Sequence, residues 1–531
     1  MLTKMVAQGR SEDAKTVILT MLQRLTTRAL RETARQHIDA LLRQHAEWLF
    51  VSSNGQSQSL RRSEIEIVCA HDRLVLSCWT EKGTRTWRIQ SWQWNGETLV
   101  MQASRRFGAE QPQLELVPRA SATAIAATIR AARQLRCERL AELACDSQLK
   151  TTIERCALSP GTRPGHPGRY ARIVLRWKGE RIAVTAPVVA SNPSSVDEFL
   201  SSALLWFTRM RDRARSAFIE QLWLIVSGEL ASRMCYRVAL LRESLKEVIN
   251  IFVVDDALNS LLPLTCPARH ELWTKKLARF PLVPAATMTE QTRAILAEAP
   301  DAIDVVHSRH GETLRYFGLP FARVRSLLGT ERVWFGIDSS HRRLLDESCW
   351  REWQDLLNDL REHRSSTTRD HRHAFYRTAA EAWLESLLRR DITRLDPGLI
   401  IAPLHAQFRT AQSGKLGIRP IDLLALRQDG RLVVIELKAA EDREHVLQGA
   451  DYWRRVEAHR RRGHIAKAKL FGDKKIKDEP PLVYLVAPTL RVHPAFHTLA
   501  RCISNDIEIY RFDINEDWRS GVRVMRRMRV N

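Results

Sequence analysis

The sequence predicts a multidomain α/β protein whose C-terminal domain is a three-layer α/β/α unit built on a mixed sheet. Three observations support this fold class. The chain has 531 residues, of which 44% are hydrophobic, enough to bury several cores. Its apolar residues recur in some segments with period two and in others at helical spacing. Near the C-terminus these patterns follow the order helix, hairpin, helix, strand, helix, strand.

Pattern and composition divide the chain into five predicted segments. They are an N-terminal helical segment, a small antiparallel β module, an α/β domain, a mixed α/β connector that ends in a polar linker, and the C-terminal domain. Their expected ranges are 1–60, 61–118, 119–258, 259–370 and 371–531.

The β module contains four tryptophans, which we expect in its core. Stacking of nucleic-acid bases on an exposed ring is the alternative. These residues are Trp79, Trp87, Trp92 and Trp94.

A predicted β-hairpin in the C-terminal domain carries three charged side chains. The apolar runs LLAL and LVVIEL flank an Asp-Gly turn, a pattern that favours two antiparallel strands. Asp422 lies on the first strand, and Glu436 and Lys438 share one face of the second because residues two apart point the same way. Buried charges are costly unless they are paired or bind a metal, so these residues indicate a site.

Two carboxylates and a backbone carbonyl, that of Leu437, form an oxygen-rich set suited to Mg²⁺ or Mn²⁺. Lys438 supplies a positive charge that can orient or deprotonate an attacking water and offset negative charge on a phosphoryl group. A buried salt-bridged trio without a metal is the alternative.

An Asp followed by Glu-Leu-Lys on a hairpin resembles the PD-(D/E)XK nucleases, the restriction-endonuclease-like superfamily. Gln448 and Tyr452, four residues apart on the next predicted helix, are similar to the Gln-x-x-x-Tyr signature of its RecB-type branch. The sequence departs from the pattern at the proline, because Ile421 separates Pro420 from Asp422. The resemblance implies a restriction-endonuclease-like fold and a Mg-dependent deoxyribonuclease.

The resemblance also implies roles for further residues. Family members carry a glutamate on the helix before the catalytic hairpin. Its carboxylate would contact a ligand of the metal or bind a second metal. Glu381 is the first choice for this residue, with Glu385 as the alternative. Gln448 and Tyr452 are expected to orient the substrate or Lys438. Polar residues on a helix surface are the alternative for this pair.

The α/β domain upstream repeats the element order of the C-terminal domain. Aligning the Lys-Gly turn at 178–179 with the Asp-Gly turn at 429–430 places Ala171, Thr185 and Pro187 where the C-terminal domain has its aspartate, glutamate and lysine. We therefore hypothesise a degenerate nuclease-like repeat, retained as a scaffold or for gripping nucleic acid. A chance coincidence of element order is the alternative.

The net charge of +22 favours a polyanionic partner, most simply DNA. A basic cluster follows the predicted helix of Gln448 and is expected to bind phosphates, with a solvated loop as the alternative. Its residues are Arg454, Arg455, Arg460, Arg461, Arg462, Lys474 and Lys475.

The sequence predicts a metal-dependent nuclease that hydrolyses DNA phosphodiester bonds, in repair, recombination or defence. A catalytically silent nucleic-acid-binding adaptor with a nuclease fold and an RNase are the alternatives. Nine scattered cysteines without a C-x-x-C pair favour the reducing environment of the cytoplasm. The sequence has no apolar run long enough to cross a membrane, so we expect no membrane partner. A homo-oligomer is compatible with the sequence. The sequence contains no Gly-rich phosphate loop, so it does not predict an ATP-driven motor.

Overall fold

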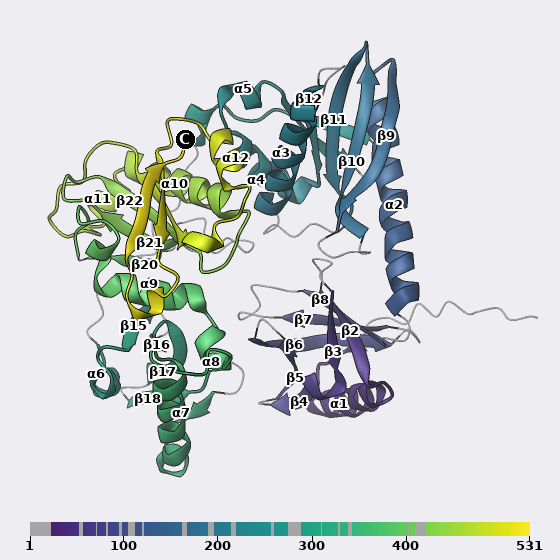
Figure 1. Cartoon of the computed structure of the whole chain (residues 1–531). Coiled ribbons are helices and arrows are strands. Elements are labelled where there is room, and N and C mark those ends of the chain that lie inside the picture. The colour runs from purple at the N-terminus through teal and green to yellow at the C-terminus, as the bar shows by residue number, and fades with distance from the viewer. Residues whose placement is uncertain are drawn as a thin grey trace, which may run out of the picture. The chain divides into compact units, whose positions relative to one another are not determined.

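The residues that the structure describes have a mixed α/β architecture with four sheets (Figure 1). Its two compact units comprise Met1–Ser52, Gln56–Cys78 and Trp87–Ala122, and Ser53–Gly55, Trp79–Thr86 and Thr123–Asn531. The computed structural model describes residues 23–52, 57–70, 72–80, 83–94, 98–104, 112–118, 122–161, 167–189, 196–213, 219–255, 260–273, 288–308, 311–327, 330–337, 342–401, 403–408 and 421–531.

The first unit is an antiparallel sheet with one helix, α1 (Arg28–Arg43). Thr27 begins this helix by accepting a hydrogen bond from the Leu30 amide, and Ile38 and Leu42 are among the residues that it buries. The strands are β1 (Gln23–Arg24), β2 (Glu47–Ser52), β3 (Ser57–Arg61), β4 (Ile65–Ala70), β5 (Arg73–Thr80), β6 (Gly83–Trp94), β7 (Leu99–Ser104) and β8 (Gln113–Pro118).

The antiparallel β module predicted for residues 61–118 is confirmed, but it begins earlier than expected. The prediction of a helical segment over 1–60 is wrong for β2 and β3, because Glu47–Ser52 is rich in aromatic and branched residues and pairs with β8. Trp87 and Trp92 are buried in the core as expected, whereas Trp79 is 44% exposed.

The second unit begins with a three-layer domain in which α2 (Ala122–Asp146) packs on one face of a sheet and two other helices pack on the opposite face. The sheet strands are β9 (Thr151–Pro160), β10 (Pro167–Trp177), β11 (Glu180–Pro187), β12 (Ile219–Val226), β13 (Ile249–Asp255) and β14 (Ser260–Leu264). The further helices are α3 (Val196–Arg213), α4 (Gly228–Val238) and the short α5 (Glu243–Lys246). Helix α4 ends at Val238, and α5 covers only four residues of the segment that follows.

An antiparallel five-stranded sheet with α6 (Glu290–Glu298) and α7 (Trp350–His363) follows. The polar linker predicted at its end is wrong at Arg364, whose side chain is fully buried and donates to five backbone carbonyls. The strands are β15 (Ile303–Ser308), β16 (Gly311–Tyr316), β17 (Leu319–Leu327), β18 (Thr330–Phe335) and β19 (Arg343–Leu344).

The C-terminal domain is also three-layered, with α9 (Ala380–Arg390) on one face of its sheet and α10 (His445–Arg461) on the other. Its strands are β20 (His405–Phe408), β21 (Ile421–Leu426), β22 (Leu432–Leu437), β23 (Leu482–Pro488), β24 (Ile509–Ile514) and β25 (Val524–Arg529). Three shorter helices complete it, α8 (Ala374–Arg377), α11 (His464–Lys467) and α12 (Phe496–Cys502).

The first and third sheets of the second unit have the same topology. Each sheet contains its six strands in sequence order, so β9 to β14 are equivalent to β20 to β25 position by position. In each, the first three strands are antiparallel, the third to fifth are parallel, and the sixth is antiparallel. The predicted repetition of element order is therefore present in the fold. Among the described residues, no helix is long and apolar enough to cross a membrane.

Candidate functional site

The two strands of the predicted hairpin bring Asp422 and Glu436 opposite each other. Leu423 pairs with Ile435 in the antiparallel ladder of β21 and β22, so the preceding residue, Asp422, faces Glu436. The backbone N–H of Leu437 donates to Asp422 Oδ2 over 2.9 Å. The apolar side chains of both strands support this register, because they fill the cores on either face of the sheet.

Lys438 follows β22 and is buried beside the carboxylates. Its Nζ lies 2.9 Å from Glu436 Oε1 and 3.2 Å from Asp442 Oδ2. Sequence reasoning missed Asp442, which lies four residues after Lys438 in the loop before α10 and also accepts the Glu444 amide over 2.7 Å. An Asp shortly before a helix is a capping signal that could have identified it.

The structure separates the two glutamates proposed for α9. Glu381, in the first turn, is exposed, and its carboxylate acts electrostatically on both Asp422 and Lys438. Glu385 is buried one turn later and pairs with Arg315 over 3.0 Å. Of the two, Glu381 is therefore the one that can act on the candidate site, whereas Glu385 joins α9 to the neighbouring antiparallel sheet.

Helix α10 covers the site with buried polar residues. Gln448 and Tyr452 are 5% and 4% exposed, so the alternative of surface polar residues is wrong for both. Gln448 Nε2 donates to Glu444 Oε2 over 3.2 Å. His445 Nε2 lies 3.2 Å from the Glu436 carbonyl oxygen, a contact that sequence reasoning missed.

Burial and the arrangement of charges set the protonation of the site. Burial and the facing Glu436 carboxylate raise the pKa of Asp422 well above 3.8. Burial opposes the charge of Lys438, but the surrounding carboxylates, first that of Glu436, outweigh it and raise the pKa of the ammonium. Burial and Lys438 lower the pKa of His445 to about 4. At neutral pH Lys438 is thus a fixed cation and His445 is neutral.

The site has a surplus of acceptor oxygens. Four carboxylates, those of Glu381, Asp422, Glu436 and Asp442, act on or contact a single ammonium group. Glu436 Oε2 is buried without a hydrogen-bond partner, and so is Gln448 Oε1. An excess of buried acceptor oxygens is what Mg²⁺ and Mn²⁺ satisfy. Among the described residues, no three His, Cys, Asp or Glu side chains are grouped closely enough to hold a metal alone. A backbone oxygen such as that of Leu437 would therefore have to contribute.

The predicted basic cluster is not one phosphate-binding surface. Arg454 and Arg455 are buried in α10 and form ion pairs with Asp451, so their assignment to phosphate binding is wrong. Arg460 is largely buried against Glu457, and Arg462 donates to the Trp273 carbonyl oxygen over 2.6 Å. Both therefore act in packing.

Three members of the cluster remain exposed, and two of them lie far from the site. Arg461 is 48% exposed and pairs with Glu457. Lys474 and Lys475 line an open pocket of about 530 Å³ together with Arg427 and the hairpin turn. This turn is at the opposite end of β21 from Asp422, five residues or about 17 Å along the strand.

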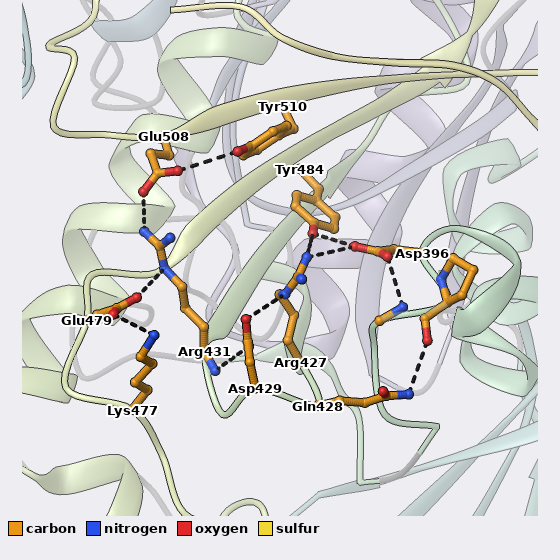
Figure 2. A network of polar contacts seen from close by, with 12 residues as sticks. Asp396, Arg427, Gln428, Asp429, Arg431, Lys477, Glu479, Tyr484, Glu508 and Tyr510 are labelled. Carbon is orange, nitrogen blue, oxygen red and sulfur yellow. Dashed lines mark hydrogen bonds and ion pairs between the residues drawn. The ribbon is translucent and has the colours of Figure 1, made fainter.

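A polar network holds that end of the hairpin (Figure 2). Arg427 Nη1 donates to Tyr484 and to Asp396 over 3.1 and 3.2 Å, and Tyr484 Oη donates to Asp396 over 2.6 Å. On the other side of the turn, Arg431 pairs with Glu508 over 2.5 Å. These contacts fix the turn, and with it the register that places Asp422 opposite Glu436.

A scan of protein-family models finds no match to this chain, and comparisons with curated proteins and with solved structures find none either.

Proposed function

We propose that residues 371–531 form a metal-dependent nuclease of the PD-(D/E)XK type that hydrolyses DNA phosphodiester bonds. The observation that supports this most is the surplus of carboxylates around Lys438, with an unpartnered buried oxygen on Glu436. A purely structural ion pair would balance its charges, because unpaired buried carboxylates destabilise a fold.

Asp422, Glu436 and the Leu437 carbonyl would hold Mg²⁺ or Mn²⁺, with Glu381 at the entrance from α9. Bound there, the cation would lower the pKa of a coordinated water and withdraw charge from a phosphoryl oxygen.

The residues of the chain supply charge and orientation. Lys438, whose pKa the surrounding carboxylates raise, can position a water and stabilise negative charge on phosphate. Asp442 holds the ammonium at the end of β22. Gln448 and Tyr452 form the wall on the α10 side, where the free Gln448 Oε1 can accept a hydrogen bond from substrate or water.

The test is cleavage of labelled single- and double-stranded DNA, and of RNA, with Mg²⁺ or Mn²⁺. We expect DNA to be cut only with a divalent cation, and Lys438→Ala and Glu436→Gln to lose at least about 100-fold in rate. Lys246→Ala, which changes a lysine paired with Glu243 in the upstream domain, is the matched control and should cut normally.

Other outcomes separate the alternative functions. DNA binding without cleavage under any divalent cation would identify a silent adaptor. Preferential cleavage of RNA, lost in the same two variants, would identify an RNase with this site.

A further inference from the structure

The two domains of equal topology pack against each other through equivalent elements. Leu241, which follows α4, forms an antiparallel bridge with Ile503, which follows α12. The Arg242 N–H donates to the Cys502 carbonyl oxygen over 2.9 Å, and the Ser504 N–H donates to the Leu240 carbonyl oxygen over 3.0 Å. Each helix joins the fourth and fifth strands of its sheet, so the contact is reciprocal.

The helices follow the same relationship. Helix α4 contacts α10, and the equivalent α12 contacts α3, while α3 and α10 also contact each other. Their apolar residues form one continuous core, which includes Phe199, Leu230, Val446 and Leu499. Reciprocal contacts of this kind characterise an isologous dimer interface, which here lies within a single chain.

The upstream domain, which contains β9 to β14, lacks equivalents of the proposed site residues. The positions equivalent to Asp422, Glu436 and Lys438 fall in the segments 171–173 and 184–188, whether the two hairpins are aligned by their turns or by their strand pairing. These segments contain no Asp, Glu or Lys. Thr185, one of these residues, is buried and donates to the Ala171 carbonyl oxygen over 2.8 Å. The place of the site is thus occupied by an internal hydrogen bond.

One arginine of the upstream domain, which contains β9 to β14, forms an ion pair with the helix that covers the site. Arg237 of α4 pairs with Asp197 of α3 over 2.5 Å and with Asp451 of α10. Asp451 is 3% exposed and lies directly beside Tyr452 in the sequence. It also pairs with Arg455, whose guanidinium lies 4.4 Å from the centre of the Tyr452 ring.

We propose that the domain of β9 to β14 is an internal, catalytically inert partner of the nuclease half, and that Arg237 is a positioning residue that sets α10 against the site. This inference rests on the proposed function. Through Asp451, Arg237 fixes the axial position of α10 and thereby the distance of Gln448 and Tyr452 from Glu436.

The experiment compares Arg237→Met and Arg237→Lys with wild type in the full chain. The readouts are kcat and KM for DNA with Mg²⁺, and amide hydrogen exchange of α10 and of β21–β22. Arg237→Met should lower kcat by about 10- to 100-fold, with KM within about twofold, because small displacements of orienting groups reduce rate more than binding. Exchange should accelerate in α10 and not in the hairpin, and Arg237→Lys should be intermediate.

Arg181→Met is the matched control, because Arg181 forms an ion pair with Glu154 in the same domain, distant from α10 in the fold. It should behave as wild type.

Unchanged kcat and unchanged α10 exchange in folded Arg237→Met would overturn the proposal, as would faster exchange spread evenly over both domains. If Arg237→Met does not fold, Arg237→Lys decides by the same criteria. If wild type cuts no nucleic acid, the proposed function fails, whereas the exchange measurement still decides whether Arg237 holds α10.

Discussion

The ammonium of Lys438 lies 2.9 Å from one oxygen of Glu436, while the other oxygen of the same carboxylate is buried without a partner. The ion pair therefore satisfies only half of Glu436. Asp422, on the facing strand, receives a hydrogen bond from the Leu437 amide. This asymmetry leaves acceptor oxygens available to a cation, and it leads to the first two predictions.

Replacing Asp422 by Asn should separate stability from activity. The raised pKa of Asp422, due to burial and Glu436, means that the ionised form of this carboxyl destabilises the metal-free fold. Stability from this group is present below its ordinary pKa and is lost as pH rises through the folded-state pKa. Asp422→Asn should therefore increase the free energy of unfolding by about 1 kcal/mol at pH 8 and abolish cleavage. Denaturant titration without metal checks this, and a less stable variant would contradict it.

Divalent cations should stabilise the folded protein through this site. At a Mn²⁺ concentration of about 100 times Kd, mass action adds about 2.7 kcal/mol to the free energy of unfolding. The gain should disappear in Glu436→Gln, which retains the shape of the side chain and removes its charge. Thermal unfolding with Mn²⁺ and with EDTA measures the effect. Equal stabilisation of the two proteins would place the ion elsewhere.

Each chain should cut one DNA strand per encounter. The C-terminal hairpin has the carboxylates and the lysine, whereas the equivalent segments 171–173 and 184–188 do not. With supercoiled plasmid in excess over protein, we expect nicked circles to accumulate before linear DNA on a gel. Linear product that appears from the start at the rate of nicking would argue for two coordinated sites.

Substitutions of exposed and of buried basic residues after the hairpin should have different effects. Lys474→Ala or Lys475→Ala should reduce the slope of log binding constant against log salt by about 1 if that lysine contacts a phosphate. Arg455→Met should instead lower the free energy of unfolding by about 2 kcal/mol, because Arg455 is buried beside Asp451. DNA binding at several salt concentrations and denaturant unfolding distinguish the two classes.

His459 should make the fold sensitive to mild acid. Burial, and next the neighbouring His464, lower the pKa of His459 to about 3, so the folded state favours the neutral ring. Its contribution is complete above the unfolded pKa of about 6.5 and is lost as pH falls. Between pH 6.5 and 5 the loss is about 2 kcal/mol, at about 1.4 kcal/mol per pH unit. His459→Gln, which does not titrate, should show a flatter dependence in unfolding measured over this range.

The elements of the C-terminal domain were largely predictable because their signals are local. The apolar run at 481–488 and the alternation at 522–530 correspond to β23 and β25. The shared element order of the two domains was also visible in the sequence, and the strand directions of both sheets agree with it. By contrast, the strand Glu47–Ser52 was mistaken for helix, since its pairing with β8 is a non-local contact.

The sequence by itself determined which chemical groups the hairpin carries and that Asp422, Glu436 and Lys438 share a short stretch of sheet, because side-chain direction in a strand depends only on residue spacing. Tertiary structure decided which other charges reach them. Glu381 acts electrostatically on Asp422 and Lys438, whereas Glu385 pairs with Arg315. Arg454 and Arg455 are internal because α3 and α4 cover α10. The physical reason is burial: the neighbours of a charge depend on which helix faces meet, and sequence spacing within one helix does not specify them.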